Sequence, residues 1–379
     1  MPRRQNAPTR DQVLAALRDV EDPELRKSLV DLEMVREVTV RDGHVSVDAL
    51  LTISGCPLRE TIEASIAERV KALPGVTGVS VNLGVMSQEQ RQALIQRLRG
   101  GEMHPDRQPA FLTADSPTRV IVVASGKGGV GKSTVTANLA MAMAVDGRQV
   151  GVIDADVYGF SIPRMLGIAG QPTAVDQMLI PLERDGIRVM SIGFLVPDEG
   201  EAVVWRGPML HKALLTFIQE VHWGDDLEYL FIDLPPGTGD VSLTIAQTLP
   251  RASMLIVTTP QPAAAAVAQR AAKMAEKVNM DVVGVIENMS GFAATPGGPT
   301  IDVFGRGGGR RLAEQLGVPL LGEIPIDVAI REGSDSGQPV VVAHPQSPAA
   351  VVLRDIARRL AELLPVVVHT RGGGPWRRD

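Results

Sequence analysis

The sequence predicts an α/β protein in which a large domain with a parallel sheet follows a smaller α/β unit. From residue 119 onward, short apolar segments recur at residues 120–124, 150–153, 229–232, 255–258, 282–286 and 320–324. Stretches of helix length separate most of them, at residues 132–145, 208–221, 262–277 and 348–363. Buried strands that alternate with helices are typical of a parallel sheet covered by helices on both faces.

Residues 1–86 predict the smaller unit. Thr9 and Gln12 have the spacing of a capping box, which predicts the start of a helix. Two strands joined by a tight turn, a second helix and a third strand are then expected. These elements fall at residues 35–40, 45–51, 57–73 and 76–83.

Residues 87–118 are interpreted as a linker. Its first part, residues 88–99, predicts a polar, exposed helix, after which glycines and prolines interrupt regular structure. Residues 119–370 form the predicted large domain. The Gly-rich, basic residues 371–379 are expected to be a disordered tail.

Composition excludes several classes of function. A net charge of −6 and an aromatic content of 3% argue against a nucleic-acid-binding surface. No apolar run is long enough to span a membrane, and no secretory signal follows the basic start, so we expect a soluble cytoplasmic protein without a membrane partner. The single cysteine, Cys56, excludes an intrachain disulfide framework.

Residues 126–134 read GKGGVGKST, which fits the pattern of a phosphate-binding P-loop. The glycines let backbone N–H groups curl around phosphate oxygens at the start of the following helix. Lys132 can neutralise the β- and γ-phosphates, and the Ser133 hydroxyl can join a Mg²⁺ shell. An apolar strand before the loop and an amphipathic helix after it argue against a chance match. The predicted nucleotide-binding residues here are Gly126, Lys127, Gly128, Gly129, Val130, Gly131, Lys132, Ser133 and Thr134.

Acidic residues follow two of the apolar strands, where a carboxylate commonly supports Mg²⁺. Asp233 ends the segment at residues 229–232, and Asp154 and Asp156 follow residues 150–153. Strand alternation would point Asp154 and Asp156 the same way, toward the phosphates, if the chain stays extended. Capping of a loop is the alternative role for one of these residues.

The second lysine of the loop, Lys127, gives it the deviant form GKGGxGKST. This form resembles the dimeric class that contains the nitrogenase iron protein and the septum-site-determining ATPases. Four further segments resemble the Mrp/ApbC-type iron–sulfur cluster carriers: residues 152–163 (VIDADVYGFSIP), 205–212 (WRGPMLHK), 231–240 (FIDLPPGTGD) and 287–292 (ENMSGF). Residues 9–84, with DPE at 22–24 and TISGCP at 52–57, resemble the MIP18-type domain that precedes bacterial members.

The resemblance implies a slow, Mg²⁺-dependent ATPase that acts as a nucleotide-switched homodimer in iron–sulfur cluster assembly. Scaffold or apo-acceptor proteins would be its partners. Lys127 would reach across the dimer to the partner's nucleotide, and Asp156 would orient the attacking water. Asn288 would read the adenine edge, although on its own it reads as a polar turn residue after a strand. The implied catalytic residues are Lys127, Lys132 and Asp156, and the implied Mg²⁺ ligands are Ser133, Asp154 and Asp233.

The sequence departs from these carriers where a C-x-x-C pair commonly binds the cluster. Ala294 and Gly297 occupy the expected positions, and neither can ligate iron. Cys56 is then a possible cluster thiol, placed before a predicted helix start, or else a buried and inert small side chain. A nucleotide-switched scaffold that binds no cluster is therefore the alternative function. A metabolic ligase of the same P-loop class is a third, without support for any substrate.

Three further features carry weaker expectations. The six histidines lack the spacing of metal ligands. Residues 305–309 (GRGGG) are interpreted as a mobile turn before a helix, or as a second phosphate loop. Arg206 either contacts a switch region or partner subunit, or is an ordinary solvated residue at a helix start.

Overall fold

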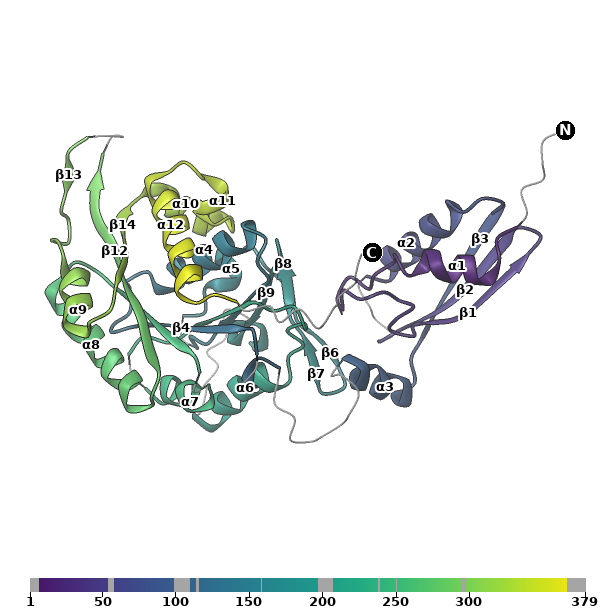
Figure 1. The fold of residues 1–379 in the computed structure, drawn as a ribbon, viewed down its shortest axis with the longest axis horizontal. Helices are drawn as coiled ribbons and strands as arrows, with labels where there is room; N and C mark the ends of the chain where they lie inside the picture. Colours follow the sequence, from purple (N-terminus) through teal and green to yellow (C-terminus); the bar gives the residue numbers. More distant parts are fainter. Residues whose placement is uncertain are drawn as a thin grey trace, which may run out of the picture. The chain divides into compact units, whose positions relative to one another are not determined.

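The computed structural model describes residues 7–53, 58–98, 110–113, 116–157, 159–196, 207–237, 239–249, 251–294 and 298–366 (Figure 1). The chain divides into two compact units. The small unit consists of Met1–Arg107 together with Thr173–Ile180, and the large unit consists of Gln108–Pro172 and Pro181–Asp379.

The small unit contains a three-stranded sheet and three helices, most of which the sequence predicts. Its elements before residue 99 are α1 (Arg10–Leu17), β1 (Val35–Arg41), β2 (His44–Leu51), α2 (Arg59–Lys71), β3 (Gly78–Val85) and α3 (Gln88–Leu98). The predicted capping box is present, because Thr9 and Gln12 each accept the other's backbone N–H. The β1–β2 turn places Asp42 and Gly43 at positive φ, as a type I′ hairpin turn requires.

The predicted helix at residues 88–99 is present as α3, but the prediction that it is exposed is wrong. Leu94, Ile95 and Leu98 of α3 are buried and belong to the hydrophobic core of the small unit. The hairpin of β6 (Thr173–Val175) and β7 (Met178–Ile180) belongs to the same core. Figure 1 places this hairpin beside α3. Most residues of this helix are polar, and the chain segment that packs in the same core lies far downstream. The local sequence therefore predicts an exposed helix.

The large unit is built on a nine-stranded sheet. Its strands are β4 (Arg119–Ser125), β5 (Val150–Asp154), β8 (Leu182–Arg184), β9 (Ile187–Ser191), β10 (Tyr229–Asp233), β11 (Ser253–Thr258), β12 (Asp281–Ala293), β13 (Thr300–Ile301) and β14 (Leu320–Ile326). The order is β13-β12-β11-β4-β10-β5-β9-β8, with β14 also paired to β12. The central pairs are parallel, as predicted, whereas β8 and β13 pair antiparallel at the two ends.

Helices cover both faces of this sheet. They are α4 (Lys132–Val145), α5 (Ile162–Met165), α6 (Gly207–Gln219), α7 (Asp240–Thr248), α8 (Pro262–Lys277), α9 (Gly308–Leu316), α10 (Val328–Ser336), α11 (Val340–Ala343) and α12 (Pro348–Leu363). In Figure 1, α4, α5 and α10–α12 lie on one face, and α6–α9 lie on the other. Short 3₁₀ turns occur at Ala110–Leu112 and Ile192–Leu195.

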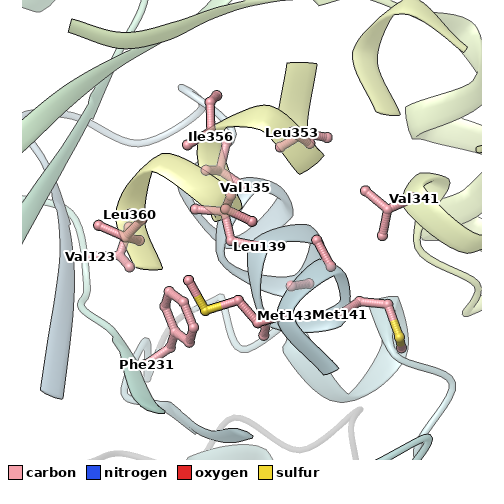
Figure 2. Close-up of a cluster of buried hydrophobic side chains, with 14 of the residues drawn as sticks. Val123, Val135, Leu139, Met141, Met143, Phe231, Val341, Leu353, Ile356 and Leu360 are labelled. Atoms are coloured by element: carbon pink, nitrogen blue, oxygen red, sulfur yellow. The ribbon is translucent and has the colours of Figure 1, made fainter. Parts of the chain in front are cut away.

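The main core of the large unit lies between the sheet, α4 and α12. Figure 2 shows Val123 and Phe231 from adjacent strands facing Leu139 and Met143 of α4, with Leu360 of α12 closing the cluster. The burial of α4 on nearly all sides holds the start of this helix, and therefore the loop before it, in a fixed place. Within the described residues, no helix has both the length and the apolar character needed to cross a membrane.

Candidate nucleotide-binding site

The predicted P-loop connects the carboxyl end of β4 to the start of α4. This is the strand–loop–helix setting that the sequence pattern requires. Gly129 and Gly131 both have positive φ, at 76° and 80°, and Gly131 is the N-cap of α4. Their left-handed backbone turns the loop, and residues with a Cβ rarely adopt it.

Two neighbours hold this loop closely. A Cβ at Gly126 would lie 2.3 Å from the backbone nitrogen of Ala268 in α8, so the backbones approach too closely for any other residue. On the opposite side, Asn288 Nδ2 donates to the Val130 carbonyl at 2.8 Å. The same amide nitrogen lies 2.2 Å from where a Cβ of Gly131 would be.

Lys132, Ser133 and Asp233 form one polar cluster, in which Lys132 and Asp233 are buried and Ser133 is half-buried. Lys132 Nζ lies 2.6 Å from Asp233 Oδ2, and the Ser133 hydroxyl donates to the same oxygen at 2.6 Å. Thr136, one turn along α4, donates to Asp233 Oδ1 at 2.9 Å. Asp233 is fully buried and Lys132 is 6% exposed, so each charge depends on the other for compensation.

Asp154 lies on the neighbouring strand, directly opposite Asp233 in the β5–β10 register. Its carboxylate accepts from the backbone N–H groups of Asp156, Ser161 and Ile162 and from the Ser191 hydroxyl, at 3.0–3.2 Å. It thereby anchors the loop after β5 and the start of α5. Asp154 thus caps the loop, which is the alternative role that the sequence allows. Its role as a metal ligand stays a prediction.

Burial and the nearby Asp233 carboxylate raise the pKa of Asp154 to about 7. Desolvation is the larger cause, because a charged carboxylate is disfavoured in a dry interior. The hydrogen bonds from Ile162 and Asp156 and the charge of Lys132 act in the opposite direction.

Asp156 does not continue the strand. Its backbone N–H folds back onto Asp154 Oδ1, which forms a turn in place of the extended chain that would point both carboxylates the same way. Asp156 is half-buried and lies close to Gly159, on the loop that Asp154 anchors. Its role with the attacking water stays a prediction.

The signature lysine has a partner within its own chain. Lys127 Nζ donates to Gln261 Oε1 at 2.9 Å, and the Ser125 hydroxyl donates to the Lys127 carbonyl at 3.1 Å. Gln261 is the N-cap residue of α8 and follows β11. The lysine ammonium is therefore held beside the loop by a hydrogen bond to an uncharged amide oxygen.

Residues 305–307 lead into α9, which begins at Gly308, and the Gly309 N–H of this segment already donates to a carboxylate. The buried Glu287 carboxylate accepts from the Gly309 N–H at 2.6 Å and from the Ser290 hydroxyl at 2.7 Å. A Cβ at Gly308 would lie 2.3 Å from the Pro260 carbonyl, so these glycines serve close packing. The structure favours the turn before a helix over a second phosphate loop.

Several predicted positions lie outside the described residues, namely Cys56, Gly297, Arg206, His104 and His369. Ala294 is described and lies just beyond β12. In the part of the chain that the structure describes, no group of three or more His, Cys, Asp or Glu side chains could hold a metal ion.

Thr136, Gln261 and Glu287 were not predicted as site residues from the sequence. Thr136 follows Lys132 by one helical turn, so helix spacing alone places it on the same side of α4. Gln261 follows the carboxyl end of β11, and ligands in open α/β sheets bind at such ends. Glu287 is an acid within an apolar strand, which is itself a sign of a buried hydrogen-bond network.

The site has the chemistry that a nucleoside triphosphate with Mg²⁺ requires. The glycine loop presents backbone to a ligand. Among the described residues other than its own chain neighbours, no heavy atom lies within 4 Å of where a Cβ of Gly129 would be. The Ser133 hydroxyl and the Asp233 carboxylate, both oxygen donors, already lie together, and Mg²⁺ prefers oxygen ligands. Fold and site together define a P-loop NTPase.

Comparison with known families agrees. The family model described as NUBPL iron-transfer P-loop NTPase matches residues 116–361, and one described as iron–sulfur cluster assembly protein matches residues 10–82. The chain therefore belongs to the NUBPL iron-transfer P-loop NTPase family, with an iron–sulfur-cluster-assembly-type domain in front. Because the family match covers most of the large unit, the predicted fold class is confirmed.

Relatives match over almost the whole chain. The iron-sulfur cluster carrier protein of Mycobacterium tuberculosis is 49% identical over 356 residues, which cover 92% of each chain. The protein of the same name from Bacillus subtilis is 41% identical over 360 residues, 94% of this chain and 99% of its own.

Solved structures match a large part of the chain. A nucleotide-binding protein from Archaeoglobus fulgidus, in complex with ADP, is 42% identical with a TM-score of 0.51, covering 58% of this chain and 86% of its own. The cell division ATPase MinD of Pyrococcus furiosus, at 24% identity and a TM-score of 0.50, covers 65% of this chain and 99% of its own. The MinD likeness concerns the fold alone.

Proposed function

We propose that this chain is a Mg²⁺-dependent ATPase that acts in iron–sulfur cluster assembly or transfer to apoproteins, as a nucleotide-switched homodimer in the cytoplasm. The observation that carries the ATPase part is the polar cluster of Lys132, Ser133 and Asp233 beneath a glycine loop that also holds Lys127. The iron–sulfur part rests on the names of the relatives.

The residues divide the work of phosphoryl transfer to water. Backbone N–H groups of the loop and the Lys132 ammonium bind the phosphates, and Lys127 of the partner subunit stabilises charge on the γ-phosphate in the transition state. Asp156 orients the attacking water. Ser133, Asp154 and Asp233 would hold Mg²⁺, and the bound ion would neutralise phosphate charge.

Asn288 can offer a base both a donor and an acceptor. Its Nδ2 gives one of its two hydrogens to the Val130 carbonyl, so one N–H and the Oδ1 acceptor remain. The acceptor suits the amino group of adenine, and the donor suits a ring nitrogen beside it. ATP is therefore the nucleotide that we assign to this site.

Two lysine variants test the ATPase. Lys132→Ala should abolish ATP binding, because the main phosphate charge partner is lost and Asp233 is left buried without a counter-ion. Lys127→Ala should leave the ATP dissociation constant near that of the wild type and lower hydrolysis by about a thousandfold, as for loss of an arginine finger. Equal ATPase rates for Lys127→Ala and wild type would contradict the role of Lys127.

The cluster function needs a separate experiment. A homodimer contains two cysteines, both Cys56, whereas a conventional cluster takes four thiolates. Any cluster would then be held by Cys56 together with ligands from outside this chain. Anaerobic reconstitution with iron and sulfide, followed by absorption spectroscopy and transfer to an apo-acceptor, should give a chromophore in the wild type and none in Cys56→Ser.

The alternative is a nucleotide-switched scaffold that binds no cluster. The observation in its favour is the replacement of the usual C-x-x-C pair by Ala294 and Gly297. If the wild-type dimer takes up no chromophore and passes none to an acceptor while its ATPase is intact, the scaffold function is supported.

A further inference from the structure

The small unit is discontinuous in sequence, and its second part is a hairpin from a distant segment. Thr173–Ile180 interrupts the chain of the large unit, yet it belongs to the small unit. The hairpin strands β6 and β7 pair antiparallel with each other. The remainder of the small unit ends about seventy residues earlier in the chain, which follows from the unit boundaries at Arg107 and Thr173.

The hairpin contributes one apolar face to the small unit's core. Val175, Met178 and Ile180 are 1%, 1% and 4% exposed and lie in one hydrophobic cluster with Leu94 and Leu98 of α3. Ala174 and Gln177, on the same hairpin, are exposed. One buried apolar side and one exposed side are typical of an element that docks onto a core, because burial of aliphatic side chains is the main source of the free energy of docking.

Polar contacts fix the orientation of the hairpin. The Thr173 hydroxyl donates to Glu24 Oε1 at 2.8 Å, and Arg91 Nε donates to Asp176 Oδ1 at 3.2 Å. Glu24 belongs to the Asp-Pro-Glu motif, in which Asp22 Oδ1 accepts from the backbone N–H groups of Glu24 and Leu25 at 2.9 Å each. Asp22 therefore shapes the turn that presents Glu24 to Thr173.

We infer that the hairpin Thr173–Ile180 is the docking element that attaches residues 7–98 to the rest of the protein, with Glu24 as its orienting contact. The connecting segment at residues 99–118 is then dispensable for attachment. This assigns a role to the Asp-Pro-Glu motif in intramolecular docking. The inference goes beyond the proposed function and does not depend on ATP hydrolysis or on a cluster.

A cleavage experiment on the full chain tests it. A protease site is inserted after Gly101, and the purified protein is cut. The two wild-type fragments should stay together in size-exclusion chromatography, and sedimentation over a dilution series should give their affinity. Val175→Asp should weaken that affinity by about a hundredfold or more, because a carboxylate would be buried without a partner. Ala174→Asp, the matched change on the exposed face, should behave as wild type.

A milder pair keeps the test valid if Val175→Asp disturbs folding. Thr173→Val keeps the shape of the side chain and removes one hydrogen bond, so the affinity should fall about fivefold. In a Glu24→Ala background the same change should have no further effect, because the two residues form one contact. Separation of the cut wild-type fragments, or an affinity between the cut Val175→Asp fragments equal to that of the wild type, would overturn the inference. ATPase activity, measured separately, does not enter this result.

Discussion

Single side chains connect the phosphate-binding loop to the strands and helices beside it. Asp233 pairs with Lys132 and accepts hydrogen bonds from Ser133 and Thr136. Asp154 instead accepts hydrogen bonds from the loop after its own strand. Both acids were predictable, because each ends an apolar strand at the same edge of a parallel sheet. Their different partners were not, because the direction of a carboxylate depends on loops that carry no periodic pattern.

Gly126 gives a direct test of close packing at this scale. In Gly126→Ala the added Cβ would meet the backbone of α8, so loop or helix must move. We expect a loss of about 1–3 kcal/mol in the free energy of unfolding without nucleotide, together with weaker ATP binding. Gly128→Ala is the matched control, because the nearest atom to its Cβ would be Pro236 Cγ at 3.9 Å. Equal stability of the two variants in chemical denaturation would refute the packing argument.

The raised pKa of the buried Asp22 carboxyl predicts that the stability of the small unit depends on pH. Burial raises the pKa of Asp22 above its ordinary value of 3.8, against the two backbone hydrogen bonds that lower it. Its contribution to stability is therefore complete below about pH 3.8 and is lost as the pH rises through the raised pKa.

Asp22→Asn keeps an acceptor oxygen for the N–H groups of Glu24 and Leu25 and removes the buried charge. At pH 7 we expect it to be as stable as the wild type or more stable, with a flatter pH profile between pH 4 and 7. Hydrogen–deuterium exchange of the small unit over this range measures the difference. A variant less stable than wild type at pH 7 would show that the charge itself is needed.

Among the secondary structure elements, those with a strong periodic pattern were predicted well. The strands β4, β5, β10 and β11 and the helices α4, α8 and α12 lie within a few residues of their predicted ranges. The elements at 162–195 were not predicted, because β6, β7 and β8 have three residues each, α5 has four, and the charged Arg188 interrupts the apolar pattern of β9. The exposure of α3 was wrong because its partner β6–β7 is remote in sequence; the Thr173–Glu24 bond spans 149 residues.

The burial of α3 can be tested by shortening single side chains. Leu94 is fully buried, so Leu94→Ala should lower the free energy of unfolding by about 2–5 kcal/mol. Gln92, which is exposed on the same helix, should tolerate alanine within about 0.5 kcal/mol. Thermal unfolding of both variants distinguishes a core helix from a solvated one, since an exposed helix would make the two changes equal.

At the scale of the whole molecule, the order of motifs predicted the family, and the structure added the discontinuity of the small unit. Local patterns reveal a P-loop and a parallel sheet, since each strand and its loop are contiguous in the chain. They do not reveal which distant segment completes a core. The proposed cluster function is likewise not visible in local pattern, because the cysteine pair that would identify it is replaced at Ala294 and Gly297.

The central claim is a dimer in which Lys127 of one subunit completes the site of the other. The most direct test mixes Lys127→Ala with Asp156→Ala, each of which should be nearly inactive alone. In a mixed dimer, the Lys127→Ala subunit keeps its own Asp156 and receives Lys127 from its partner, so one complete site is restored. With random pairing we predict roughly a quarter of the wild-type ATPase rate. A mixture that stays as inactive as its components would contradict the account.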